Sequence, residues 1–98
     1  MEITYKNKKM KDVCTNYSCA VKKYGEHMAY KIHIRIDNIK AFDRVEELIA
    51  YKIGRCHALQ NNRRGQYAID LEHPYRLIFT VKGNEIQIAN ILEIVDYH

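Results

Sequence analysis

The sequence predicts an α+β fold, in which an N-terminal strand and two to three helices pack on one face of a small antiparallel sheet. Apolar residues recur at intervals of three and four through the first half of the chain, as on one face of a helix. They alternate with polar residues through most of the second half, as in strands. The 98 residues, 47% of them hydrophobic, suffice for one compact core. We therefore expect a single domain over residues 1–98.

A short strand is predicted at the N-terminus, where Ile3 and Tyr5 alternate with polar residues. The following apolar residues are spaced by three and four and predict one helix over residues 10–24, which Gly25 ends. These apolar residues are Val13, Cys14, Tyr17, Val21 and Tyr24.

Residues 26–42 fit two patterns. Three isoleucines alternate with basic residues over 31–36, which is typical of a strand. The same segment places four apolar residues at helical steps, and its length suits a helix better than a strand. These four are Met28, Ile32, Ile36 and Ile39. We therefore predict a second helix over this segment.

A brief third helix or turn is predicted after residue 42. Asp43 and Glu46 have the spacing of a capping box, and a short apolar face follows before Gly54.

The second half predicts three strands, over residues 66–72, 75–81 and 86–95. His73 and Pro74 break the first run, and Gly83 and Asn84 can form a two-residue hairpin turn. That turn would pair Lys82 with Glu85, Leu77 with Asn90 and Arg76 with Ile91.

Composition excludes several classes. No run approaches the ~20 apolar residues that span a bilayer, and the first residues lack the pattern of a signal peptide, so we expect a cytoplasmic protein. Cys14, Cys19 and Cys56 match neither a disulfide framework nor a paired zinc motif. We interpret them as reduced thiols in the core, and we expect no metal or other cofactor.

Positive charge gathers in two places, although the net charge is only +4. Four lysines crowd residues 6–11, and residues 48–69 contain no carboxylate at all. The second segment predicts a positive field suited to the phosphates of a nucleic acid. Its cations are Lys52, Arg55, Arg63 and Arg64.

The C-terminal residues Asp96, Tyr97 and His98 are candidate catalytic groups, together with His57 and Arg76. Cleavage of RNA by its own 2′-hydroxyl needs a base, an acid and a cation on the phosphate, and these residue types supply all three. With the predicted register, Tyr97 would lie roughly 20 Å beyond the partner of Arg76 on a straight strand. We therefore predict a bulge or kink between Asn90 and Glu93 that folds the last residues back toward Arg76.

Four short motifs resemble the HigB-like toxins of the RelE/ParE superfamily of bacterial toxin-antitoxin systems. They are Gly-Arg-Cys-His-x-Leu at 54–59, Arg-Gly-Gln-Tyr at 64–67, His-Pro-Tyr-Arg-Leu at 73–77 and the terminal Asp-Tyr-His. The resemblance implies a RelE-like fold and a ribosome-dependent endoribonuclease that cuts translated mRNA in the A site, without a metal. It also implies a helix-turn-helix antitoxin as partner, through which the toxin would contact operator DNA only indirectly.

The resemblance further implies roles for single residues. Asp96 or His98 would be the base, Tyr97 would orient or stack on the substrate, His57 would assist proton transfer, and Arg76 would stabilise phosphate charge. The RNA-binding residues would be Lys52, Arg55, Gln60, Arg63 and Arg64.

Two positions depart from the family pattern. Ala58 stands where a proline is usual, and Gln60 stands where a lysine often follows. Two other functions stay open: a ParE-like inhibitor of DNA gyrase, which shares the fold and needs no nucleolytic residues, and an inactive domain that only binds antitoxin, which Gln60 favours.

Overall fold

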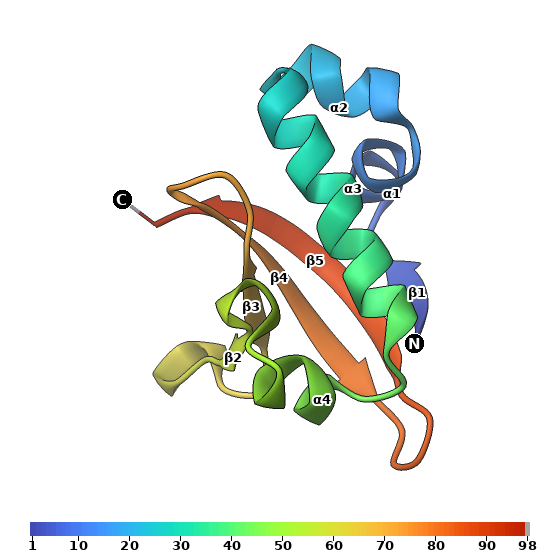
Figure 1. The fold of residues 1–98 in the computed structure, drawn as a ribbon, viewed down its shortest axis with the longest axis vertical. Helices are drawn as coiled ribbons and strands as arrows, with labels where there is room; N and C mark the ends of the chain where they lie inside the picture. The colour runs from blue at the N-terminus through green and yellow to red at the C-terminus, as the bar shows by residue number, and fades with distance from the viewer. Residues whose placement is uncertain (98) are drawn as a thin grey trace.

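A computed structural model describes residues 1–97 of the chain. Helices α1, α2 and α3 lie together beside a twisted sheet, in which β4 and β5 are the long strands (Figure 1). The strands are β1 (Glu2–Tyr5), β2 (His57–Ala58), β3 (Tyr67–Asp70), β4 (Tyr75–Lys82) and β5 (Ile88–Asp96). The α-helices are α1 (Lys8–Thr15), α2 (Tyr17–Tyr24), α3 (Glu26–Ala41) and α4 (Val45–Ala50), with 3-10 turns η1 (Ile53–Arg55) and η2 (Asn61–Arg63).

The sheet has the strand order β1-β5-β4-β3-β2, and β1 runs parallel to β5 while all other pairs are antiparallel. The predicted α+β class, with helices packed against a sheet, is confirmed. The predicted antiparallel sheet consists of β2, β3, β4 and β5, and β1 adds a parallel strand at its edge because it pairs with β5 in the same direction.

The core lies between the sheet and the helices α3 and α4. Ile32 and Ile39 of α3 are fully buried against the same cluster as Leu77 and Phe79 of β4. The helical spacing of the α3 isoleucines, rather than their strand-like alternation, therefore determined the structure of residues 26–41.

Asn16 divides the first predicted helix into α1 and α2. Its backbone N–H donates to the Asp12 carbonyl at 2.9 Å, and its side-chain oxygen accepts a hydrogen bond from the Cys19 N–H at 3.2 Å. The prediction of one continuous helix is wrong here, because an asparagine can end one helix and cap the next.

The start of α4 differs by one residue from the predicted capping box. The Glu47 carboxylate, not that of Glu46, accepts the N–H groups of Asp43 and Arg44, each at 3.2 Å. The helix consequently begins at Val45.

Gln87 is the buried polar residue that sets the β4–β5 register. Its N–H donates to the Asp43 carbonyl at 3.2 Å, and its side-chain oxygen accepts the Val45 N–H at 2.8 Å. Gln87 is thus held at the start of α4, and the last pair of the ladder is Lys82 with Ile88. The predicted two-residue turn and its pairings are wrong, because this tertiary contact lengthens the hairpin loop to residues 83–87.

A β-bulge interrupts β5 at Leu92. Phe79 pairs with Ile91 and Ile78 pairs with Glu93, which leaves Leu92 as the extra residue. The predicted position of a bulge between Asn90 and Glu93 is confirmed. The predicted folding-back is wrong, because β5 continues straight along β4 until Asp96 pairs with Tyr75.

All three cysteines are free thiols, as expected. Cys14 and Cys56 are buried in the core, and burial raises the pKa of each thiol to about 12. Cys19 is only half-buried, because the side of α2 that carries it is partly open to solvent. None of the helices within residues 1–97 is long and apolar enough to cross a membrane.

Candidate functional site

The sheet has a second face that is not packed against α3. Paired residues share a face, and neighbours along a strand alternate between faces. Arg76 and Ile78 therefore point away from the core residues Leu77 and Phe79. We call this second face the open face. It carries His57, Ala68, Asp70, Arg76, Ile78, Thr80, Asn90, Glu93 and Val95.

Arg76 and Tyr97 meet on the open face. The central guanidinium carbon of Arg76 lies 4.5 Å from the centre of the Tyr97 ring, a cation–π arrangement. The Tyr97 N–H donates to the Pro74 carbonyl at 3.1 Å, which holds the end of the chain against β4. Because Arg76 pairs with Val95, Tyr97 lies close to Arg76 without the bend in β5 that was predicted from the sequence.

Asp70 lies between two arginines and was not singled out from the sequence. Its Oδ2 is 2.5 Å from Nε of Arg55, and its Oδ1 is 3.4 Å from Nε of Arg76. The hydrogen bond to this carboxylate raises the pKa of Arg55. Asp70 and Arg76 are 24% and 25% exposed, so their contact is partly shielded from water, whereas Arg55 is largely exposed.

The loop before β2 brings Arg55 to Asp70. Lys52, Gly54 and Arg55 all have a positive φ, which is costly for the two residues that carry side chains. A Cβ on Gly54 would lie 2.7 Å from Nε of Arg35, so this close approach requires glycine. That Nε donates to the Asp70 carbonyl at 2.7 Å, and burial lowers the pKa of Arg35.

His57 is placed on the edge strand β2, opposite Ala68 of β3. Its Nδ1 is 2.8 Å from the Arg55 carbonyl. A carbonyl only accepts, so Nδ1 carries the proton and Nε2 of the neutral ring is an acceptor. Two strand spacings separate β2 from β4, or roughly 10 Å, so His57 shares the open face with Arg76 but does not touch it.

Glu93 is a second acidic residue of the open face that was not predicted from the sequence. Its Oε2 lies 3.2 Å from Nη1 of Arg63, which also donates to Gln66 at 2.8 Å. Glu93 is the diagonal neighbour of Arg76 across the β4–β5 ladder, at roughly 7–8 Å between Cα atoms. Only the sheet register, which the sequence did not reveal, could have identified it.

The basic segment is thus partly neutralised by carboxylates that lie outside it in sequence. Arg55 pairs with Asp70 and Arg63 with Glu93, whereas the remaining predicted RNA-binding residues are exposed at the surface. These remaining residues are Lys52, Gln60 and Arg64.

The structure separates Asp96 from Tyr97. Asp96 pairs with Tyr75, which contacts the core, so its side chain leaves the sheet on the side opposite Arg76. His98, the third residue of the predicted cluster, lies outside the described residues. Of the predicted catalytic residues, the structure brings Arg76 and Tyr97 into contact.

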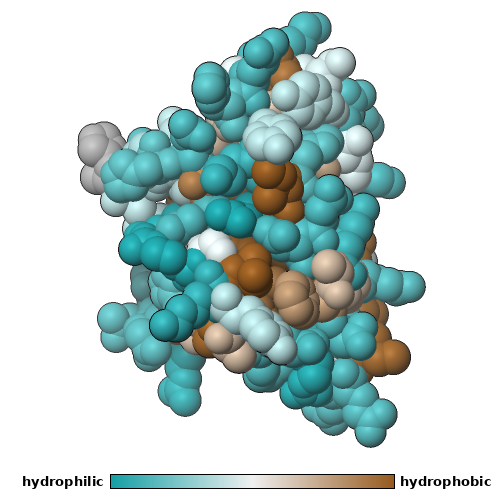
Figure 2. All heavy atoms as spheres, in the orientation of Figure 1, coloured by the Kyte–Doolittle hydropathy of each residue, from teal (hydrophilic) through white to brown (hydrophobic). Residues whose placement is uncertain are grey.

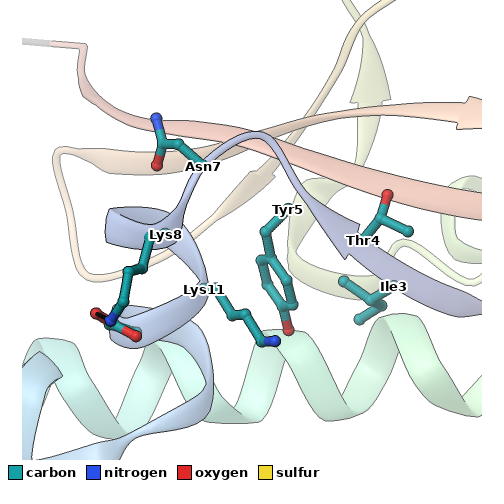
Figure 3. A pocket seen from close by; sticks show the side chains of 7 residues that line it. Ile3, Thr4, Tyr5, Asn7, Lys8 and Lys11 are labelled. Carbon is teal, nitrogen blue, oxygen red and sulfur yellow. Dashed lines mark hydrogen bonds and ion pairs between the residues drawn. The ribbon is translucent and has the colours of Figure 1, made fainter.

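A pocket elsewhere contains none of the predicted site residues. It lies between β1 and α1 and is lined by Ile3, Tyr5 and Lys11, among others, with Lys8 and Asp12 ion-paired at its rim (Figure 3). The molecule is mainly hydrophilic in the view of Figure 2, with hydrophobic side chains only in small groups. The predicted site residues therefore lie outside this pocket, on a sheet face where Arg76 is about a quarter exposed and Ala68 and Ile78 are buried.

Comparison with known proteins identifies the fold. No family model and no curated protein matches the sequence. Among solved structures, the YoeB/ParE toxin from Agrobacterium tumefaciens superposes with a TM-score of 0.68 at 16% identity, over 100% of both chains. The chain has the fold of the YoeB and ParE toxins.

Two further structures agree with this fold. The YoeB dimer from Staphylococcus aureus matches at 24% identity and a TM-score of 0.63, over 100% of this chain and 97% of that one. The YoeB-YefM complex from the same organism matches at 26% identity and a TM-score of 0.62, with the same coverage. The predicted resemblance to the RelE/ParE superfamily is confirmed, and the HigB subtype stays a prediction.

Proposed function

We propose that this chain is the toxin of a type II toxin-antitoxin system and acts as a ribosome-dependent endoribonuclease. It would cleave translated mRNA by attack of a 2′-hydroxyl on the adjacent phosphate and so arrest growth. The observation that carries the proposal is the Arg76 guanidinium lying 4.5 Å over the Tyr97 ring on an accessible sheet face. This arrangement offers a fixed cation for a phosphate and an aromatic ring for a base.

The other groups of the open face supply proton transfer in this proposal. His57 has an acceptor at Nε2 and lies on the same face, at a distance that a bound nucleotide would have to bridge. Glu93 lies nearer to Arg76 and is a second candidate base once Arg63 is drawn to phosphate. Asp96 and His98 keep the roles that the resemblance implies, although the Asp96 side chain leaves the sheet on the side opposite Arg76.

The proposed partners are an antitoxin, the ribosome and mRNA in the A site. Two structures with this fold contain YefM beside YoeB, which supports an antitoxin partner for this chain. A helix-turn-helix antitoxin, with operator DNA bound only through it, is part of the same proposal.

Induction in cells tests the function. The intact chain, Arg76→Ala and a chain truncated after Val95 would each be induced while growth and mRNA 5′ ends are followed by primer extension. Arg44→Ala is the matched control, since it removes one guanidinium at the start of α4. We expect arrest and new mRNA ends from the intact chain and the control, and neither from the other two. Equal toxicity of all four, or arrest without new ends, would overturn the nuclease.

A ParE-like inhibitor of DNA gyrase is the second candidate, because one structural neighbour is described as a YoeB/ParE toxin. This alternative predicts arrest that survives Arg76→Ala and that is accompanied by loss of negative supercoiling in a reporter plasmid. The same induced cultures supply that plasmid, so one experiment separates the two functions.

A further inference from the structure

Asp70 contacts two arginines through equivalent atoms. Its carboxylate lies against Nε of Arg55 on one oxygen and Nε of Arg76 on the other. Among the contacts that the structure describes, no protein group binds the terminal nitrogens of either guanidinium. Since an arginine binds phosphate through a fork of donors, both forks stay available for an anion.

The contacts of Asp70 are not those of an ion pair optimised for stability. Its Oδ1 is buried and accepts no hydrogen bond within the described structure, and such an oxygen costs free energy. Arg55 is largely exposed and occupies a left-handed backbone conformation, and exposed ion pairs add little stability. Unsatisfied groups and strained backbone of this kind often mark functional sites.

We infer that Asp70 is a positioning residue that fixes Arg55 and Arg76 as one two-arginine binding site for the scissile phosphate. The inference deepens the proposed nuclease and rests on it. Arg76 forms a 3.4 Å ion pair with Asp70 at Nε, without a hydrogen bond, and its flat face lies on the Tyr97 ring, so these two contacts orient it before substrate arrives. The negative charge of Asp70 also lowers the net positive charge of the two arginines, so Asp70 weakens RNA binding while it orients them.

Asp70→Asn should therefore change binding and cleavage in opposite directions. The amide keeps the shape of the side chain and removes the charge that holds the arginines. We expect single-turnover cleavage of mRNA on translating ribosomes to fall about 100-fold, as for a catalytic group displaced by about 1 Å. Binding of a 2′-O-methyl RNA oligonucleotide, which cannot be cleaved by its own hydroxyl, should become tighter, with a salt slope steeper by up to ~0.7.

Asp37→Asn is the matched control, because it makes the same charge change at an exposed site on α3. It should leave cleavage at the wild-type rate. Once Arg55 and Arg76 are both replaced by alanine, Asp70→Asn should slow cleavage no further, because Asp70 acts through these two arginines. A purely structural role of Asp70 would instead lower cleavage and binding together, and its effect would add to that of the arginine substitutions.

The results separate this inference from the proposed function. If the wild-type chain makes no new mRNA ends, the proposed nuclease is overturned. If RNA binding by Asp70→Asn then has the same salt slope as RNA binding by Asp37→Asn, the role of Asp70 is overturned as well. If the wild-type chain cleaves and Asp70→Asn cleaves equally fast, only the role of Asp70 is overturned. Should Asp70→Asn fold poorly by its melting curve, Arg55→Ala decides instead, since that side chain is exposed, and a wild-type cleavage rate would overturn the two-arginine site.

Discussion

At the scale of single residues, the open face combines groups that the sequence predicted with groups that it did not. Arg76 and Tyr97 were predicted and lie in contact. Asp70 and Glu93 were missed, because a carboxylate in an alternating strand is indistinguishable from an ordinary solvated residue until its neighbours are known. Each becomes a candidate because an arginine from a distant loop contacts it, and no local sequence pattern predicts such a long-range contact.

Tyr97 allows the ring and the hydroxyl to be tested separately. Tyr97→Phe keeps the surface on which the Arg76 guanidinium lies, and Tyr97→Ala removes it. If the ring positions Arg76, the phenylalanine variant should cleave within a few-fold of wild type, and the alanine variant about 100-fold more slowly in single-turnover assays. Equal losses in both variants would show that the hydroxyl takes part in the reaction.

At the scale of elements, periodicity predicted which segments form helices and strands but not how they meet. The α3 isoleucines and the alternating residues of β3 and β4 were assigned correctly because burial on one face leaves a repeat in the sequence. The break at Asn16 and the β4–β5 register were missed. The first depends on one side chain capping a helix, and the second on Gln87 binding the start of α4.

The bulge at Leu92 determines which side chains of β5 share a face with Arg76. Leu92 has no partner in β4. A chain from which Leu92 is deleted can therefore keep all the β4–β5 pairs, and Tyr97 then stays beside Arg76. We expect deletion of Leu92 to preserve the sheet and most of the cleavage. Deletion of Val95 would shift Tyr97 to the opposite face and reduce cleavage to the level of Tyr97→Ala. Far-UV circular dichroism and single-turnover cleavage measure the two effects, and equal activity of the deletions would refute this account of the bulge.

At the scale of the whole molecule, the buried thiols make stability depend on alkaline pH. Burial raises the pKa of Cys14 and of Cys56 from about 9 to about 12. Between these values the unfolded chain loses the thiol protons and the folded chain keeps them. The free energy of unfolding therefore falls as pH rises above about 8.5, by up to about 1.4 kcal/mol per pH unit for each thiol.

Urea unfolding between pH 7.5 and 10 measures this dependence. Tyr5 and Tyr24, whose pKa values are also raised by burial, begin to contribute only toward the top of this window, where the unfolded tyrosines start to ionise, and they do so equally in every variant. We expect a variant with Cys14→Ala and Cys56→Ala to be less stable at pH 7.5 and to lose less stability toward pH 10. Cys19→Ala, at the half-buried position, should keep the wild-type dependence. If the free energy of unfolding of the double variant falls with pH as steeply as that of the wild type, groups other than these thiols cause the loss of stability at alkaline pH.

The contacts of Gln87 also bear on how the chain folds. A peptide containing only β4 and β5 would have the Gly83-Asn84 turn signal without the helix that holds Gln87, so the tight turn and its register would be favoured in isolation. We therefore expect docking of α4 to favour the native hairpin loop over the tight turn. Local sequence and final structure disagree at this loop, and the native loop depends on contacts with residues 43–45, more than forty positions earlier in the chain.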